Sequence, residues 1–182
     1  MRRSLQPGPG RSTLPANKMY VGLISDTHGV FSDGFKKFLE PVDVIWHAGD
    51  FGGGLSFADS IAAFKPLVGV SGNCDGQDIR LEYPQHQFLQ VQGLKILMTH
   101  IGGSPGHYDL RAAALIDRYK PDVFICGHSH ILKVMQDHAN NMLYINPGAA
   151  GLQGWQVVRT ALRFKIEAGE VKEMEVFELP RS

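Results

Sequence analysis

The sequence lacks the features that mark several large classes of protein. It contains no apolar run near the 18 or so residues that a membrane-spanning helix requires. Its two cysteines, Cys74 and Cys126, form neither a CxxC pair nor a disulfide framework. The glycine-rich stretches 52–54 and 102–106 lack the GxGxxG, GKS and GKT patterns of dinucleotide and phosphate loops. We therefore expect no membrane span and no nucleotide-binding loop, and a reducing cytoplasm is the expected compartment.

The net formal charge is zero, but charge is distributed unevenly along the chain. Residues 1–18 contain four basic residues and no acid, which leaves 14 of the 18 basic residues against all 18 acidic ones in the remainder, a net of −4. This net negative charge argues against a basic surface that binds duplex DNA, but it is compatible with a small phosphorylated substrate. The length predicts one domain over residues 19–182, and the composition predicts a disordered extension over residues 1–18.

The first half of the body alternates between two kinds of apolar pattern. Short apolar runs predict strands at 19–25, 43–47 and 67–70, and helical spacing predicts helices at 33–40 and 55–64 between them. This β-α-β-α-β order favours parallel strands with right-handed crossovers.

The second half is richer in strands. Gln92-Gly93 and Asn140-Asn141 are typical of hairpin turns, and Ala168-Gly169 separates two long strands expected within 157–178. One more helix is expected over 108–119 and one more strand over 122–126, with Cys126 in the core. We therefore expect one α/β domain with mixed sheets.

Polar residues that can bind metals follow the predicted strands in five short clusters. The clusters are Asp26-Thr27-His28, Gly49-Asp50, Gly72-Asn73, His100 and Gly127-His128-Ser129-His130. Because ligands gather at the carboxyl ends of strands in open α/β sheets, these clusters are expected to meet at one rim. Seven ligand residues are too many for one tetrahedral zinc ion and suit two dications that share a carboxylate.

Each cluster alone has an ordinary structural explanation, such as a turn, a left-handed cap or a hydrogen-bonded strand-end histidine. Their combination and order carry the metal hypothesis. Two dications with only Asp26 and Asp50 as anionic ligands keep a residual positive charge, which suits an anionic phosphate. Imidazole and carboxylate together favour manganese, iron or zinc over calcium or magnesium.

The string DTH … GD … GN … H … GHSH resembles the calcineurin-like metallophosphoesterase superfamily, above all its small YfcE-like phosphodiesterases, over about residues 19–178. The resemblance implies a four-layer αββα sandwich, two mixed β-sheets flanked by helices. It also implies two divalent metal ions, with Mn²⁺ expected first and iron, zinc or nickel as alternatives. The residues that the family pattern assigns to one metal are Asp26, His28 and His130; those for the other are Asn73, His100 and His128; Asp50 bridges both.

The resemblance also implies an activity. The expected reaction is hydrolysis of a small phosphodiester by a hydroxide that bridges the metals, with His28, Asn73 and His128 acting on the substrate. A homo-oligomer, dimer or tetramer, is typical of relatives. Two alternatives stay open. One is a non-catalytic scaffold that resembles a retromer subunit and binds protein partners, and the other is a nuclease or phosphomonoesterase.

Four further residues are candidates for supporting the ligands or contacting substrate. Cys74, in Asn73-Cys74-Asp75, stands where many relatives have a histidine as general acid; a thiol donates a proton less readily, and a small side chain packed behind the site is the alternative. Asp75, the next residue, is a candidate for the same roles as Cys74. His47 is expected to be partly buried and to orient a ligand. His107 follows a flexible loop, 102–106, from which it could reach substrate.

Overall fold

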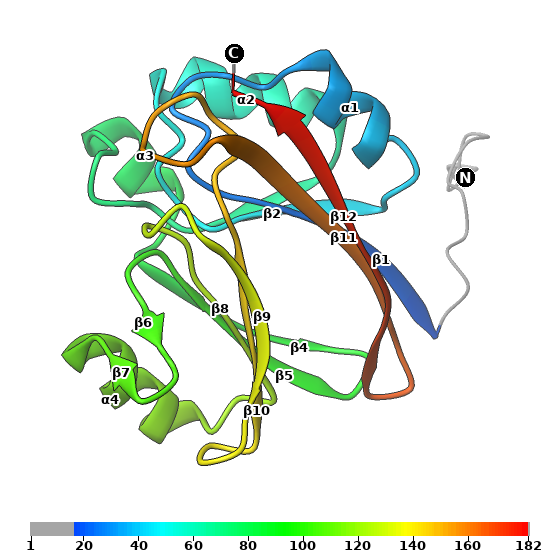
Figure 1. Ribbon diagram of the computed structural model, residues 1–182, viewed down its shortest axis with the longest axis vertical. Helices are drawn as coiled ribbons and strands as arrows, with labels where there is room; N and C mark the ends of the chain where they lie inside the picture. The colour runs from blue at the N-terminus through cyan, green and yellow to red at the C-terminus, as the bar shows by residue number, and fades with distance from the viewer. Residues whose placement is uncertain (1–16, 182) are drawn as a thin grey trace, which may run out of the picture.

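Residues 17–181 are described by a computed structural model of the chain (Figure 1). The predicted extension lies outside the described residues as far as residue 16. Asn17 forms a turn, and Lys18 already begins the first strand, one residue before the predicted boundary. Within residues 17–181, no helix combines the length and apolar character needed to cross a membrane.

The first sheet contains the three parallel strands predicted from the first half of the chain. Its strand order is β12-β11-β1-β2-β3, in which β1 pairs parallel with β2 and β2 with β3, while β11 pairs antiparallel with β1. Its elements, with the connecting helices, are β1 (Lys18–Ile24), α1 (Asp33–Leu39), β2 (Val44–His47), α2 (Gly54–Phe64), β3 (Leu67–Gly69), β11 (Val158–Glu167) and β12 (Glu170–Pro180).

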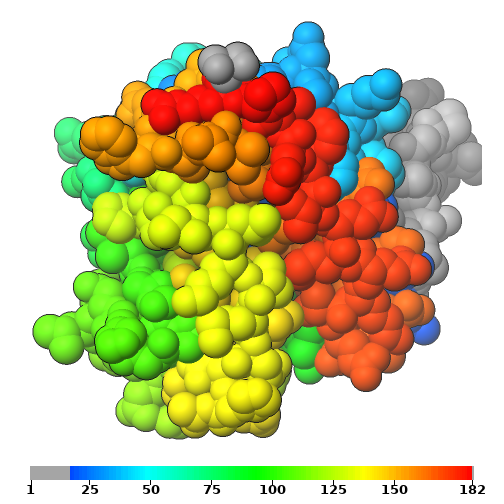
Figure 2. Space-filling model, viewed as in Figure 1, coloured from blue at the N-terminus to red at the C-terminus, as the bar shows by residue number. Residues whose placement is uncertain are grey.

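The second sheet has the order β4-β5-β8-β10-β9, with β5, β8 and β10 parallel and both edge strands antiparallel. Both predicted hairpins are present, because β4 turns into β5 at Gln92-Gly93 and β9 turns into β10 through Asn140-Asn141. The elements are β4 (His86–Val91), β5 (Leu94–Thr99), α4 (Leu110–Tyr119), β8 (Val123–Ile125), β9 (Leu132–Asp137) and β10 (Met142–Pro147). On the face shown in Figure 2, the β9–β10 hairpin (yellow) lies beside β11 and β12 of the first sheet (orange to red).

Three short elements were not predicted. Helix α3 (Gln77–Glu82) is only six residues long, too short to show a helical repeat of apolar residues. Strands β6 (Gly103–Ser104) and β7 (His107–Tyr108), of two residues each, form a short hairpin. The prediction of a flexible loop over 102–106 was therefore wrong. Gly106 occupies the left-handed region in the tight connection of this hairpin.

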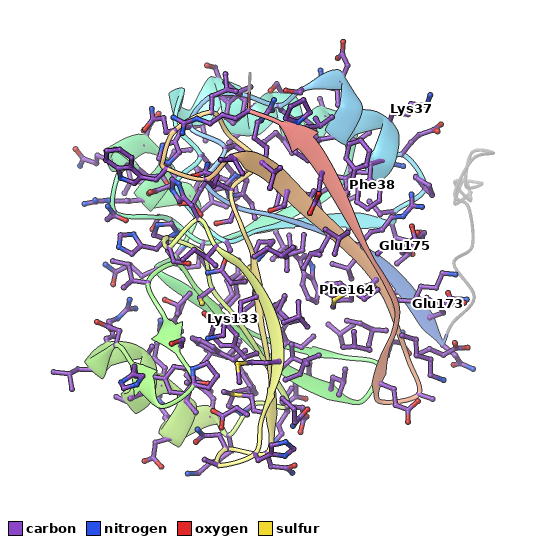
Figure 3. The ribbon with its side chains drawn as sticks, viewed as in Figure 1. Lys37, Phe38, Lys133, Phe164, Glu173 and Glu175 are labelled. Carbon is purple, nitrogen blue, oxygen red and sulfur yellow. The ribbon has the colours of Figure 1, made fainter. Side chains whose placement is uncertain are left out.

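The sheets and helices form four layers, as the resemblance implied. Residues from both sheets, including Leu23, Ile96, Ile125 and Phe164, form one buried cluster between the sheets, where Phe164 is labelled in Figure 3. A second cluster packs α1, α2 and α3 on the outer face of the first sheet, and a third packs α4 on the outer face of the second sheet. The fold is therefore an α/β sandwich of two mixed sheets flanked by helices.

Replacing Phe164 with alanine tests the central layer. The ring is fully buried and packs edge-on against Trp46, with ring centroids 6.1 Å apart. We expect Phe164→Ala to lower the free energy of unfolding by about 3–5 kcal/mol, because it removes buried apolar surface and leaves a cavity. Equilibrium urea unfolding measures this. Val176→Ala on the exposed side of β12 is the control, and an equal loss in both variants would contradict the assignment of Phe164 to the core.

Candidate metal centre

Loops from the carboxyl ends of strands in both sheets meet at one rim. The Asp26 N–H donates to the Gly49 carbonyl at 2.9 Å, and the His28 N–H donates to the Asp50 carbonyl at 3.2 Å, which joins the loops after β1 and β2. In the second sheet the Gly127 N–H donates to the His100 carbonyl at 2.9 Å, which joins the ends of β5 and β8. Backbone hydrogen bonds thus join the loops within each sheet, and the His128 N–H, which donates to Asp26 Oδ2 at 3.1 Å, joins the loops of the two sheets.

Two carboxylate oxygens face a ring of imidazole nitrogens. Asp26 Oδ1 lies 3.1 Å from His130 Nε2 and 3.8 Å from His100 Nε2. Asp50 Oδ2 lies 3.2 Å from His100 Nε2 and 3.9 Å from His28 Nε2. Four distant parts of the chain thus bring carboxylate oxygens and imidazole nitrogens as close together as two ligands of one metal ion.

Three of these atoms are buried without a hydrogen-bond partner among the described residues: Asp26 Oδ1, His28 Nε2 and His100 Nε2. Buried polar atoms are rarely left without partners, since losing water without replacement costs free energy. All three point into the same cluster, and their chemistry is that of ligands for a dication. The donor set therefore fits divalent metal ions.

Three groups of side chains within residues 17–181 could hold such an ion. In each group the candidate ligand atoms lie within 4.8 Å of one another. Asp50 belongs to two groups, as expected for a carboxylate between two metals. The groups are Asp26, His28 and His130; His28, Asp50 and Cys74; and Asp50, His100 and His128.

Hydrogen bonds to the far ring nitrogens hold two histidines in the tautomer that a metal ligand needs. His100 Nδ1 donates to the Ala48 carbonyl at 2.7 Å, and His130 Nδ1 donates to Gln156 Oε1 at 3.3 Å. With the proton on Nδ1, the lone pair of Nε2 faces the carboxylates. Gln156 was not predicted, and its distance of 26 residues from His130 left no local pattern to reveal it.

Both central carboxylates are ionised at neutral pH. Burial raises the pKa of Asp50, but the neighbouring His100 imidazole and the Cys74 N–H outweigh burial and hold the pKa well below its ordinary value. Burial likewise raises the pKa of Asp26, where the neighbouring His130 and His100 imidazoles prevail and lower it. The centre therefore carries two negative charges that favour cations.

The glycines that precede the ligands are required by close packing. A Cβ atom on Gly72 would lie 2.1 Å from Asp50 Oδ1, and one on Gly127 would lie 2.1 Å from Ser25 Oγ. Any larger residue would push these loops apart. This explains Gly72 and Gly127 better than turn formation alone, whereas Gly49 also has a φ of 101°, which favours glycine.

The backbone at the ligands is unusual as well. Five of the seven predicted ligands have positive φ angles between 46° and 69°, in the left-handed region; these are Asp26, His28, Asp50, His128 and His130. Asp and His adopt this region more readily than most residues, yet it costs about 1 kcal/mol or more at each non-glycine site. Such clustering is typical of functional sites, where surrounding contacts hold the backbone in place.

Asp75 links the loops that carry Asp50 and Asn73. Its Oδ2 accepts hydrogen bonds from the Asp50 N–H at 3.0 Å and the Gly72 N–H at 2.8 Å, and its Oδ1 accepts from the Gly52 N–H at 3.2 Å. Burial raises the pKa of Asp75, and these N–H groups act in the opposite direction. The predicted supporting role of Asp75 is thus a set of backbone contacts behind the ligands.

His47 is fully buried, not partly buried as predicted. Burial lowers its pKa to about 3, so the ring is neutral. Its Nδ1 accepts from the Gly49 N–H at 3.1 Å, which leaves Nε2 to donate to Thr27 Oγ1 at 2.8 Å. His47 therefore braces the backbone beside the ligands and makes no direct hydrogen bond to a ligand side chain.

The remaining candidates lie nearer the surface. Asn73 is exposed and, with His100, lines a cavity beside the centre. Cys74 is also exposed, so a side chain packed behind the site was wrong, and its N–H donates to Asp50 Oδ1 at 2.8 Å. His107 is exposed on β7 and belongs neither to the three ligand groups nor to the walls of that cavity.

Two supporting residues were missed in the sequence. Ser25 Oγ donates to Asp26 Oδ2 at 2.6 Å, and the same oxygen accepts from the His128 N–H at 3.1 Å. Asn146 Nδ2 donates to the Gly127 carbonyl at 2.9 Å and to Ser129 Oγ at 3.0 Å, which supports the loop that carries His128 and His130. The available signals were the position of Ser25 directly before Asp26 and the sequence Asn146-Pro147-Gly148 at the end of β10.

Comparison with known proteins agrees with this geometry. The family model of the calcineurin-like phosphoesterase superfamily domain matches residues 19–169. The chain belongs to this superfamily. A search of curated proteins found no match. Membership supports a phosphoesterase in general terms, and the ligand groups described above are the expected kind of site for it.

Solved structures with the same fold include a predicted phosphoesterase and Vps29. A predicted phosphoesterase from Streptococcus pneumoniae is 20% identical, with 90% of each chain covered and a TM-score of 0.61. A Thermotoga maritima protein is 26% identical, with 88% of this chain and 99% of that chain covered and a TM-score of 0.67. Vps29 from Chaetomium thermophilum is 17% identical, with 90% and 100% covered and a TM-score of 0.68. The fold is therefore shared with a predicted phosphoesterase, with the Thermotoga protein and with Vps29.

Proposed function

We propose that this chain is a phosphodiesterase that hydrolyses small phosphodiesters with the help of two divalent metal ions. The observation that carries the proposal is the set of buried, unpartnered atoms Asp26 Oδ1, His28 Nε2 and His100 Nε2, which face one another beneath an open rim. A purely structural cluster would have satisfied these atoms with protein hydrogen bonds. We further propose that residues 19–182 form the single domain responsible and that it acts in the cytoplasm.

The residues proposed to hold the two ions follow the family pattern, and two of the three ligand groups fall within it. Asp26, His28 and His130 would hold one ion, Asn73, His100 and His128 the other, and Asp50 would lie between them. When bound, such a pair lowers the pKa of a water molecule and offsets the charge of the phosphoryl oxygens. We take Mn²⁺ as the first candidate, with iron, zinc or nickel as alternatives that the same donors accept.

The remaining roles follow from exposure. His28 Nε2 is buried, whereas Asn73 and His128 are exposed and stand where substrate would arrive. We propose that Asn73 and His128 also orient the nonbridging phosphoryl oxygens. Cys74 is the exposed protic group beside Asp50; burial and the Asp50 carboxylate raise the pKa of its thiol, so it stays protonated. A weak acid of this kind suits ester leaving groups that need little protonation.

Metal removal and reloading test the proposal. The full chain, freed of metal with a chelator, is expected to hydrolyse neither bis(4-nitrophenyl) phosphate nor 4-nitrophenyl phosphate. Reloading with Mn²⁺ is expected to restore hydrolysis, with the diester preferred, and elemental analysis is expected to find two ions per chain. The same panel extended to 2′,3′- and 3′,5′-cyclic nucleotides and single-stranded DNA distinguishes a small-diester enzyme from a nuclease. Two bound ions without turnover of any substrate would contradict the proposal.

That last outcome would favour the second candidate, a metal-binding scaffold for protein partners. Its support is the shared fold with Vps29, for which structures with Zn²⁺ and with a cyclic peptide exist. Identity to these proteins is 17–19%, so the likeness extends to the fold alone. Retention of all seven ligand residues by this chain supports catalysis instead.

A further inference from the structure

A cavity of about 400 Å³ opens directly beside the candidate metal centre. His100 and Asn73 form its wall on the side of the centre, and Arg80 from α3 and Arg111 from α4 line it farther out. Figure 1 shows α3 and α4 on the same side of the molecule, although they belong to the outer layers of different sheets. The size is in the range of small-molecule sites, so the cavity can hold one arm of a diester.

The two guanidinium groups keep donors for a ligand. Arg80 Nη2 donates to the Asn73 carbonyl at 3.2 Å, and Arg111 Nη2 donates to His86 Nδ1 at 3.1 Å. Each contact uses one of the five N–H donors of a guanidinium. Within residues 17–181 neither arginine forms an ion pair with a carboxylate, as Arg163 does with Glu175. Both guanidinium groups therefore bond to uncharged partners at the cavity, and their positive charges are not neutralised by a carboxylate.

Asp109, the acidic residue that lines the cavity, already accepts hydrogen bonds from the backbone. Asp109 Oδ1 accepts from the N–H groups of Arg111 and Ala112, as the N-cap of α4. Arg111 itself lies in the first turn of α4, where the helix dipole disfavours a cation. Burial, and next the charge of Arg111, lower the pKa of His86, so this ring accepts the arginine N–H in its neutral form. The pairing holds the guanidinium at the cavity without cancelling its charge.

We propose that this cavity is a specificity subsite for a second anionic group, a carboxylate or a further phosphate, on one ester arm of the substrate. The inference rests on the phosphodiesterase function proposed above and narrows its substrate class. The scissile phosphoryl group lies at the metal centre, and Arg80 and Arg111 bind the distal anion with charge-assisted hydrogen bonds. Diesters with a neutral or cationic arm, such as a choline ester, are poorer substrates.

A matched pair of diesters tests the subsite. The pair is 4-carboxyphenyl 4-nitrophenyl phosphate and its 4-carboxamide analogue, which share a leaving group and differ in one charge. We expect the Mn²⁺-loaded chain to prefer the carboxylate about tenfold in kcat/KM, mainly through KM, as one charge-assisted contact predicts. Arg80→Gln and Arg111→Gln are each expected to reduce this ratio, and the double variant to remove most of it. Lys37→Gln is the control, because Lys37 is an exposed cation on α1 that does not line the cavity.

Two results would overturn the subsite: a ratio near one in the unaltered chain, or a ratio that the double variant leaves unchanged. Failure of the proposed function is recognised separately, since then neither diester is hydrolysed by any variant. In that case the subsite is tested by calorimetric binding of the matching phosphonates. In these compounds CH₂ replaces the oxygen of the scissile bond. Tighter binding of the carboxylate form that is lost in the double variant supports the subsite, and equal binding of both forms refutes it.

Discussion

Asp50→Asn is expected to reduce kcat/KM for bis(4-nitrophenyl) phosphate by about 100- to 1000-fold, the range found when one preorganised electrostatic group is removed from an active site. Asp50 is the carboxylate that belongs to two of the three ligand groups. Its Oδ1 accepts the Cys74 N–H at 2.8 Å, so an asparagine would keep its oxygen there and direct its NH₂ group toward His100 Nε2, where Oδ2 now lies 3.2 Å away. The substitution thus removes a charge and replaces a ligand with a donor.

Metal content and rate measured on the same preparation test this prediction. We expect elemental analysis to show fewer than two ions per chain in Asp50→Asn, while the unaltered chain holds two. Asp117→Asn, an exposed carboxylate on α4 that pairs with Lys120, is the control and is expected to retain full rate and metal content. A near-normal rate with two bound ions in Asp50→Asn would refute the shared position of Asp50.

The second large effect concerns stability. Asp75→Ala is expected to lower the free energy of unfolding by about 3–5 kcal/mol, because it leaves three backbone N–H groups without their acceptor, each at a cost of about 1–3 kcal/mol before water enters. Those donors belong to Gly52, Asp50 and Gly72. Asp75→Asn is expected to lose about half as much, since its amide can turn so that the oxygen still accepts from Asp50 and Gly72.

Urea unfolding of metal-free protein measures this, because bound metal would add its own stabilisation to the folded state. Asp78→Ala is the matched control. Asp78 also accepts two backbone N–H groups, from Leu55 and Ile79, but it lies at the surface, where water can replace it. Equal losses at Asp75 and Asp78 would show that burial of the Asp75 contacts contributes nothing.

Much of the fold could be predicted because its signals are local. The apolar runs of β1, β2 and β3 and the turn at Gln92-Gly93 act within a few residues, and the structure places these elements within one or two residues of the predicted bounds. Helix α3 and the β6–β7 hairpin could not be found in this way. Their few residues carry no period, and tertiary contacts, such as the packing of Ile79 in the outer cluster, hold them in place.

The sequence by itself determined the family pattern and the seven candidate ligands. Both depend only on the types of residue at the ends of successive strands and on their order. Only the tertiary structure decided which atoms meet. It placed Cys74 at the surface beside Asp50 and buried His47, which supports the backbone beside the ligands. It also brought Arg80 and Arg111 from separate layers to one cavity. The physical reason is that most of these contacts join residues 20 or more positions apart, and they arise from how strands and sheets pack, which no local pattern records.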